Sequence, residues 1–253
     1  MTQVSPMSEH LVLNARITVG RDEADAGMTP FEGVYRSILR ALYEGRYVPG
    51  QRLAAPDLMR EFDVGRGTIR EVLQRLASTG AVTIQPHKGA QVRRLSRTEV
   101  TGVLEVVEVL LGLAARGAAT AVASTAIRDG LGARYAEMCR IAAEVDFNRF
   151  LAARESYYRF LVAASDNHEL RRVFPDIQVQ IMRVQLRSFD RAADSTVMGD
   201  YTELHAAVLS GEPTLAEQAG RTHVRKTMDR VYALPDRAFE PDPAPLPSGD
   251  AYL

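Results

Sequence analysis

Polar and cationic side chains cluster over residues 65–70, at the start of a segment with helical periodicity. Arg66, Thr68 and Arg70 lie close together there, with Gly67 between them. An arginine can hold guanine O6 and N7 with two parallel hydrogen bonds. The backbone N–H groups of a first helical turn can bind a phosphate, and a glycine leaves them unobstructed. These residue types and this spacing predict contacts to DNA.

Three helices are expected to position this cluster. Apolar residues recur at i, i+3, i+4 and i+7 in the segment from Arg66 to about Ser78, which predicts a helix with one buried face. The same spacing predicts a helix that starts at Pro30 and ends before Val48. A short helix is expected near Pro56–Phe62, followed by a tight turn. The buried stripe of the third helix consists of Ile69, Val72, Leu73 and Leu76.

A β-hairpin is predicted after the third helix. Residues 81–84 and 90–93 have the composition of two strands, and residues 85–89 that of a turn. His87 and Lys88 would lie at the tip, where they can follow a phosphate backbone or reach a minor groove. Three helices and such a hairpin make a winged helix-turn-helix.

Charge is divided unevenly along the 253 residues. Residues 30–95 hold eleven Lys and Arg against six Asp and Glu, whereas the whole chain has a net charge of -1. A basic module joined to an acidic body suits a polyanionic partner for the module alone.

The remaining chain is predicted to form an antiparallel all-helical bundle. No strand pattern appears after residue 96, and the periodicity predicts helices over 97–122, 125–144, 147–166, 169–190, 199–210 and 213–233. Pro175 should kink one of these helices or mark its first turn.

The expected organisation is a flexible leader over 1–28, a DNA-binding domain over 29–95, a helical domain over 96–234 and a Pro-rich tail over 235–253. The tail should be extended and loose, because its prolines oppose a helix. The most apolar run, Val103–Ala115, is broken by two glutamates, so no membrane partner is expected. A single cysteine, Cys139, fits a cytoplasmic protein.

The basic module resembles the N-terminal domain of the GntR family of bacterial regulators. The residues that carry the resemblance are Pro49-Gly50-Gln51-Arg52-Leu53, Val64-Gly65-Arg66-Gly67-Thr68-Ile69-Arg70-Glu71-Val72-Leu73, Arg75-Leu76, Gly80 and Lys88-Gly89. The run Arg70–Ala77 looks especially like the FadR branch of that family.

The resemblance implies DNA contacts from both the third helix and the wing. The implied residues are Arg66, Gly67, Thr68, Arg70, His87, Lys88 and Gly89. Two positions depart from the family pattern. Ala55 stands where the family has a glutamate, and Gly65 stands where it usually has a serine. Alternatively, Arg70 pairs with Glu61 or Glu71 and is only part of a solvated surface.

The helical part resembles, more diffusely, the effector-binding domain of the FadR branch called FCD. Ala118-Ala119, Ser165-Asp166-Asn167 and Gly211-Glu212 are its landmarks over roughly residues 97–232. Many such domains hold a metal with one Asp and three His. Counting from the landmarks, those positions here are Arg154, Tyr158, Tyr201 and His223. Only the last could bind a metal in the family manner, so no metal or other cofactor is expected.

These four residues could instead line a pocket for an anionic or polar effector. Arg154 would replace the metal as the positive group that holds a carboxylate or phosphate. Val107 and Leu111 replace an arginine and an acidic residue of the family, which makes one wall more apolar and allows an effector with an apolar part, such as a fatty acyl derivative. The alternatives are that the tyrosines and His223 are ordinary core residues, or that His205, near Tyr201, restores part of a metal site.

The sequence therefore predicts a cytoplasmic, homodimeric transcription regulator that binds a palindromic operator and a small-molecule effector. By family analogy we expect a repressor released by its ligand. The alternatives are a helical-bundle enzyme and an interaction module whose DNA-binding domain is vestigial. Ser156, Asp200 and His205 have the right types for hydrolysis, but no sharp turn presents a nucleophile and no Gly-rich phosphate loop is present.

Overall fold

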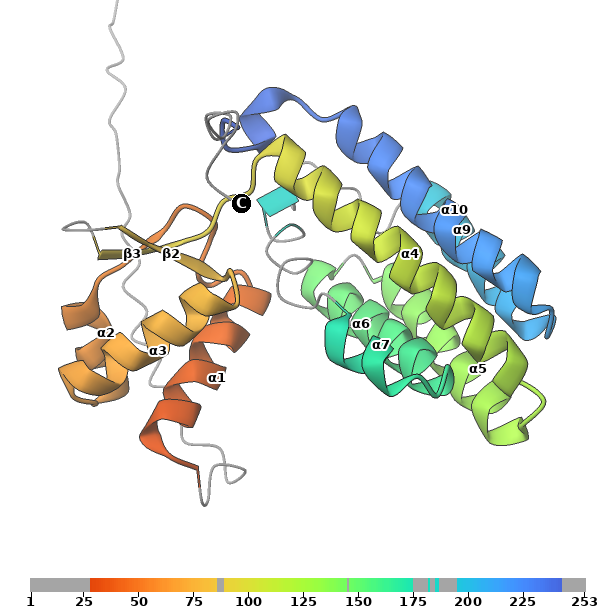
Figure 1. Ribbon diagram of the computed structural model, residues 1–253, viewed down its shortest axis with the longest axis horizontal. Helices are drawn as coiled ribbons and strands as arrows, with labels where there is room; N and C mark the ends of the chain where they lie inside the picture. The colour runs from red at the N-terminus through yellow and green to blue at the C-terminus, as the bar shows by residue number, and fades with distance from the viewer. Residues whose placement is uncertain are drawn as a thin grey trace, which may run out of the picture.

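A computed structural model of the chain describes residues 28–85, 89–144, 146–174, 182, 185–186 and 195–242. Its N-terminal half is a three-helix unit with a small sheet, and its C-terminal half is all-helical (Figure 1). This confirms the predicted mainly α class, a winged helix-turn-helix followed by a helical bundle. The predicted leader up to residue 27 and the tail from residue 243 lie outside the described residues.

Three helices and three short strands make up the N-terminal half. They are α1 (Pro30–Tyr43), β1 (Arg52–Leu53), α2 (Ala55–Phe62), α3 (Arg66–Ser78), β2 (Val82–Gln85) and β3 (Gly89–Val92). Thr29 caps α1 in a capping box with Glu32, and Pro30 occupies the first turn as expected. The four apolar residues predicted for the inner face of α3 are all buried.

The sheet contains a strand that the sequence analysis did not predict. Its order is β1-β3-β2, and both pairs are antiparallel. Arg52 pairs with Gln91 and Leu53 with Ala90. Residues 49–53 carry part of the family resemblance, but no strand was expected among them. Two residues are too few to show the alternation of a strand, and their pairing partners lie almost forty residues away.

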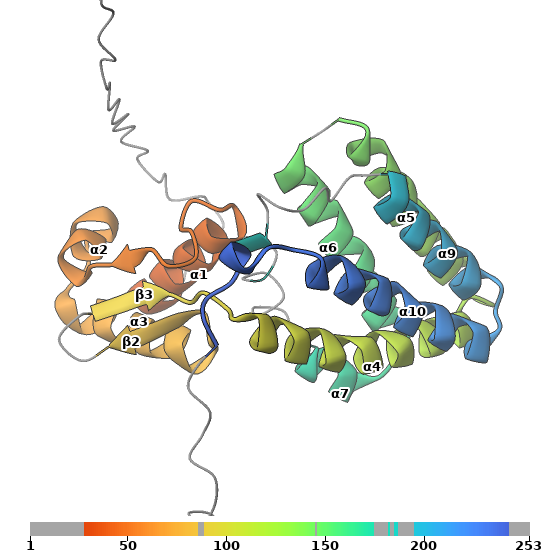
Figure 2. The same cartoon turned by 90° about the horizontal axis from the view of Figure 1, so that it is seen from above.

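Six described α-helices make up the C-terminal half. They are α4 (Arg97–Ala121), α5 (Thr125–Ala142), α6 (Phe147–Ala164), α7 (His168–Val173), α9 (Ser195–Leu209) and α10 (Pro213–Tyr232). The long helices α4 and α10 lie side by side, and α4 also packs against α6 (Figures 1 and 2). Among the described residues, no helix is both long and apolar enough to cross a membrane.

The helix predicted over 169–190 is wrong in its extent, because α7 ends at Val173. Phe174 is extended, with φ -58° and ψ 120°. The residue before a proline is driven out of the α region by the proline ring, which accounts for the end of this helix. Pro175 itself lies outside the described residues, whereas Met182, Gln185 and Leu186 have helical backbone.

The prediction of a loose tail from residue 235 is wrong for its first part. Asp236–Ala238 form a 3-10 helix, and Phe239 is only 5% exposed. Glu240 forms an isolated parallel β-bridge with Ser96, so this segment returns to the start of α4. The prolines that suggested a loose end begin only at Pro241, beyond this packed part.

Candidate DNA-binding surface and ligand pocket

The first turns of α3 present an exposed cationic surface. Arg66, Gly67 and Arg70 are exposed and Thr68 is half-buried, while the opposite face of the helix is in the core. Gly65 precedes the helix and supplies no side-chain cap, as its lack of a hydroxyl requires. Four of the predicted DNA-contacting residues therefore lie together on one accessible helix end.

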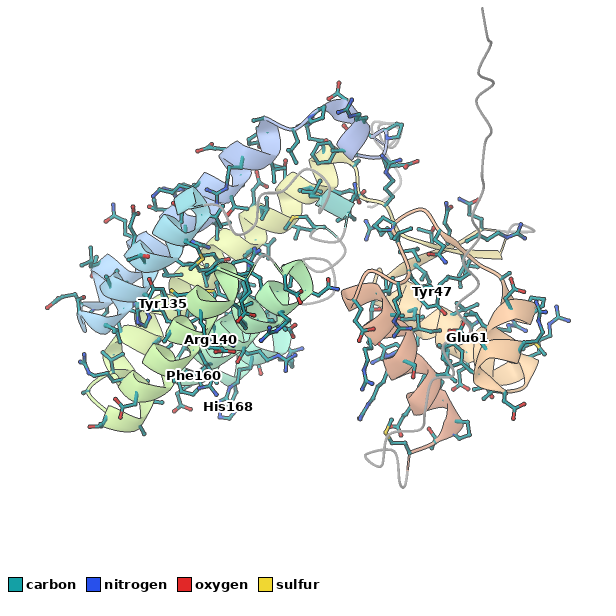
Figure 3. The ribbon with its side chains drawn as sticks, turned by 180° about the vertical axis from the view of Figure 1, so that it is seen from behind. Tyr47, Glu61, Tyr135, Arg140, Phe160 and His168 are labelled. Atoms are coloured by element: carbon teal, nitrogen blue, oxygen red, sulfur yellow. The ribbon has the colours of Figure 1, made fainter. Side chains whose placement is uncertain are left out.

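The alternative that Arg70 is held in a surface ion pair finds no support among the described residues. Neither Arg66 nor Arg70 has a carboxylate within ion-pair distance there. The carboxylate of Glu61 instead accepts a hydrogen bond of 2.9 Å from the hydroxyl of Tyr47 (Figure 3). Burial and this carboxylate raise the pKa of Tyr47, so the phenol stays protonated and donates.

Only the base of the wing belongs to the described residues. Gly89 opens β3, is exposed, and has a φ of +85°, a left-handed conformation that favours glycine. The predicted contacts His87 and Lys88 lie outside the described residues. Arg52 is an exposed cation that the sequence analysis missed as a candidate. Its Nε lies 4.0 Å from where a Cβ on Gly89 would be, and only the unpredicted pairing of β1 with β3 places it beside the wing.

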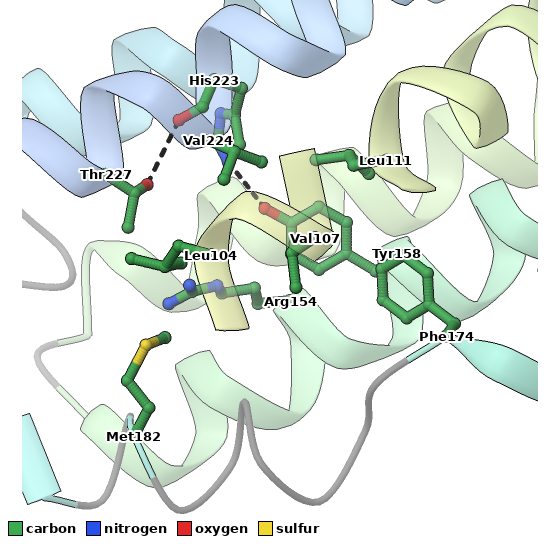
Figure 4. A pocket seen from close by; sticks show the side chains of 10 residues that line it. All are labelled: Leu104, Val107, Leu111, Arg154, Tyr158, Phe174, Met182, His223, Val224 and Thr227. Carbon is green, nitrogen blue, oxygen red and sulfur yellow. Dashed lines mark hydrogen bonds between the residues drawn. The ribbon is translucent and has the colours of Figure 1, made fainter. Parts of the chain in front are cut away.

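A second candidate site is a small pocket enclosed by α4, α6 and α10 (Figure 4). Its volume is about 40 Å³, room for roughly three water molecules at about 10–15 Å³ each. The lining residues are Leu104, Val107, Leu111, Arg154, Tyr158, Phe174, Met182, His223, Val224 and Thr227.

The structure places four of the five predicted effector-binding residues around this one pocket. Arg154, Tyr158, Val107 and His223 all line the pocket. Tyr201 does not line it but lies directly behind. The hydroxyl of Tyr158 donates to the Tyr201 hydroxyl at 3.2 Å and lies 2.7 Å from Nε2 of His223. The Arg154 guanidinium stands 5.8 Å from the centre of the Tyr201 ring.

Burial determines the charge state of this wall. His223 is 5% exposed, and burial lowers its pKa to about 4, helped by the positive charge of Arg154. At neutral pH the imidazole is therefore uncharged. Arg154 keeps its charge, because a guanidinium does not lose its proton in proteins. Among the described lining residues, the pocket thus combines one cationic group with neutral hydrogen-bonding groups and an apolar wall.

The donors of this pocket do not fit the metal that many FCD domains hold. A guanidinium is a cation without an acceptor, and neither tyrosine is a ligand at neutral pH. Over the described part of the chain, no group of three or more His, Cys, Asp or Glu could hold a metal ion. His205, weighed as a replacement ligand, stacks on Tyr135 at 4.1 Å and bonds the Tyr157 hydroxyl at 3.2 Å.

Five pocket residues were not anticipated: Leu104, Phe174, Met182, Val224 and Thr227. Thr227 follows His223 by one turn of α10, so helical spacing from His223 would have suggested it. Phe174 and Met182 enter the wall from the region after α7, which the sequence analysis took for one long helix. No pattern in the sequence shows that this region returns to the pocket.

Two of the three residues considered for hydrolysis, Asp200 and His205, are committed to other partners. The Asp200 carboxylate pairs with Arg230 at 2.6 Å and Lys226 at 3.0 Å. The Nδ1 atom of His205 bonds a tyrosine hydroxyl instead of this carboxylate. Ser156, His205 and Asp200 therefore do not form a catalytic triad.

Comparison with known proteins assigns each of the two domains to a known family. Residues 30–92 match the model of the bacterial regulatory proteins of the gntR family, and residues 102–226 match the FCD domain. Together the two matches cover most of the chain.

Two relatives and one solved structure are similar to this chain over most of its length. A probable D-xylose utilization operon transcriptional repressor of Paenarthrobacter nicotinovorans is 24% identical over 74% of this chain and 82% of its own length. The HTH-type transcriptional repressor RspR of Escherichia coli (strain K12) is 20% identical over 78% of this chain and 87% of its own length. The structure of E. coli McbR/YncC, 15% identical, superposes with a TM-score of 0.69 over 81% of this chain and 98% of that one, which shows a shared fold.

Three findings lead to one conclusion: the winged helix-turn-helix with its exposed α3, the helical domain with its pocket, and the two family matches. The chain is a ligand-responsive, DNA-binding transcription regulator of the gntR family, with an FCD domain of the FadR type.

Proposed function

We propose that two copies of this chain bind a palindromic operator in the cytoplasm and repress transcription until an anionic small molecule enters the FCD pocket. The observation that carries the proposal is Arg154, a cation 9% exposed in the wall of a pocket whose other lining residues are neutral. A guanidinium binds a carboxylate or phosphate group with two parallel hydrogen bonds, so an anionic ligand fits this wall. The sign of regulation follows the two relatives, which are named repressors.

The proposed DNA contacts are Arg66, Gly67, Thr68 and Arg70 from α3 and His87, Lys88 and Gly89 from the wing, with Arg52 beside them. In a two-fold dimer the paired α3 helices would read half-sites about one helical turn apart, which is why we expect a palindrome. Selection of genomic fragments by the purified protein at about 150 mM salt should enrich one palindromic sequence, because that salt suppresses nonspecific phosphate attraction. No enrichment at that salt would favour the alternative of an interaction module with a vestigial DNA-binding domain.

The effector we propose carries a carboxylate or phosphate and an apolar part. Its charged end would bind Arg154, and the Tyr158 hydroxyl would turn its proton from Tyr201 to this group while accepting a hydrogen bond from the neutral His223. Its apolar part would lie against Leu104, Val107 and Leu111 of α4. With room for only about three waters, the cavity must widen for a larger ligand, and that movement would supply the signal.

Octanoate is a suitable first probe, with 1-octanol as the uncharged control. Isothermal titration should show octanoate binding to the wild type and at least tenfold weaker binding to Arg154→Met, which keeps an unbranched side chain but removes the charge. Binding should persist after treatment with EDTA, because no metal takes part. Equal binding of octanoate and octanol, or octanoate binding unchanged in Arg154→Met, would overturn the anionic class.

The exposed face of α4 supports a dimer through the helical domains. Val106, Val109 and Leu113 follow one another along this face and are 52%, 50% and 40% exposed. A second copy is the occupant we propose, since two-fold pairing of one helix face matches a two-fold operator. Sedimentation should show that Val109→Glu yields monomers. Leu215→Glu, on an equally exposed leucine of α10, is the matched control and should stay dimeric. Equal behaviour of the two variants would contradict this interface.

A further inference from the structure

The side chain of Gln185 binds the linker between the DNA-binding and helical domains through both of its polar atoms. Gln185 accepts a hydrogen bond of 2.7 Å from the amide of Leu95 and donates one of 2.8 Å to the carbonyl of the same residue. It donates a further bond of 2.9 Å to the carbonyl of Ala238. The side-chain amide thus pairs with Leu95 as a neighbouring strand would, and both of its N–H groups are used.

The C-terminal segment binds Leu95 as well. We call the hydrogen bonds from Gln185 and Glu240 to Leu95 the clamp. The amide of Glu240 donates to the Leu95 carbonyl at 3.0 Å, next to its bridge with Ser96. Leu95 is 1% exposed. Its carbonyl therefore receives two hydrogen bonds from segments that lie 90 and 145 residues further along the chain. A linker held in this way cannot change direction without breaking several bonds.

The clamped linker also determines where the DNA-binding domain sits. The amide of Arg93 bonds the carbonyl of Ala81, at the start of the hairpin. Ser96 caps α4 in a capping box with Glu99. Only Arg94 and Leu95 lie between these two attachments, so a shift at Leu95 would change the placement of the sheet and α3 relative to α4.

The same clamp is close to the pocket. Met182 lines the pocket, is 4% exposed and has helical backbone, as has Gln185. The two residues are three positions apart, so their Cα atoms are at most about 11 Å from each other. A ligand that displaces Met182 therefore moves a residue tied by a very short stretch of chain to the clamp.

We propose that Gln185 is the positioning residue that couples the ligand pocket to the domain linker. With the pocket closed, Gln185 holds Leu95 and orients the DNA-binding domain. A ligand that displaces Met182 withdraws Gln185 from Leu95 and frees the linker. The coupling rests on the proposed ligand response of this pocket, and its size is limited by the difference in ligand affinity between the clamped and released states.

Hydrogen exchange of the Leu95 amide in the full-length chain tests the clamp without DNA or ligand. Gln185→Glu has nearly the same shape, but its carboxylate can only accept, and it faces the carbonyls of Leu95 and Ala238. Repulsion between these oxygens should expel the side chain, so that the Leu95 amide loses its acceptor as well. We expect Leu95 to exchange at least tenfold faster in this variant than in the wild type. Gln218→Glu makes the same chemical change on the exposed face of α10 and should leave the rate unchanged. Equal Leu95 rates in all three proteins would overturn the clamp.

The proposed coupling between the pocket and the linker is tested by a substitution that fills the pocket with a larger side chain. Val107→Phe adds a ring where a ligand would lie, and Met182→Ala, which loosens the same wall, serves if Val107→Phe does not fold. In the wild-type background either change should accelerate Leu95 exchange and alter operator affinity at least fivefold. In the Gln185→Glu background the same change should have less than a twofold effect. Equal effects in both backgrounds would refute coupling through Gln185, while an effect on operator affinity would still support the ligand response.

Discussion

The hydroxyl of Tyr158 lies 2.7 Å from Nε2 of His223, and the two side chains join α6 to α10 across the back of the pocket. Because burial and the charge of Arg154 lower the pKa of His223 to about 4, the imidazole is neutral at pH 7. A neutral imidazole with its proton on Nε2 can donate to the Tyr158 hydroxyl oxygen, whose own proton is donated to Tyr201.

Stability should consequently fall as the pH falls below about 6.5. An unfolded histidine binds a proton near pH 6.5, whereas folded His223 does not do so until about pH 4. Between these values the unfolded state binds more protons, so lowering the pH favours unfolding. From pH 7 to pH 5 the contribution of His223 is about 2 kcal/mol.

Urea denaturation of the wild type and of His223→Gln at pH 7 and pH 5 measures this contribution. The variant should lose less stability between the two pH values by about that amount. His205, whose pKa burial also lowers, remains in both proteins and cancels in the comparison. Parallel pH dependence in the two proteins would show that His223 titrates normally.

Arg66→Ala should weaken operator binding by about 1–3 kcal/mol and relax the choice of base at one position. Arg66 is exposed at the first turn of α3, and among the described residues no carboxylate holds it. Arg159→Ala, on an exposed arginine of α6 that pairs with Glu155, is the control and should bind as the wild type does. Electrophoretic mobility shifts on operator and scrambled DNA give both values. Equal losses on both DNAs would make Arg66 a phosphate contact.

Gly117→Ala should destabilise the helical domain, because α4 and α6 meet there without room for a methyl group. A Cβ at Gly117 would lie 2.7 Å from Cβ and 2.9 Å from Cα of Ser165. Overpacking against backbone costs about 1–3 kcal/mol. Gly132→Ala, within α5, meets nothing within 4 Å and should gain up to about 1 kcal/mol of helix propensity. Thermal unfolding of the two variants should move in opposite directions, and a shift of the same sign in both would disprove the close contact.

Local patterns were enough to predict most helices of this protein. The inner face of α3 and the caps and turns that bound the long helices are encoded within a few residues, because helical hydrogen bonds and amphipathic spacing are local. The cationic start of α3 is local in the same sense, since a single turn carries Arg66, Gly67, Thr68 and Arg70. Arg154, Tyr158 and His223 were selected by family resemblance, which the matches to both domains support.

Only the tertiary structure decided which distant segments meet. Arg52 pairs with Gln91, 39 positions away, and Gln185 binds Leu95, 90 positions away. Phe174 and Met182 line the pocket together with residues of helices whose mutual packing no local pattern describes. Such contacts depend on how buried faces satisfy one another and their backbone polar groups. The sequence by itself therefore determined the helices and the class of regulator, whereas packing determined the pocket and its connection to the linker.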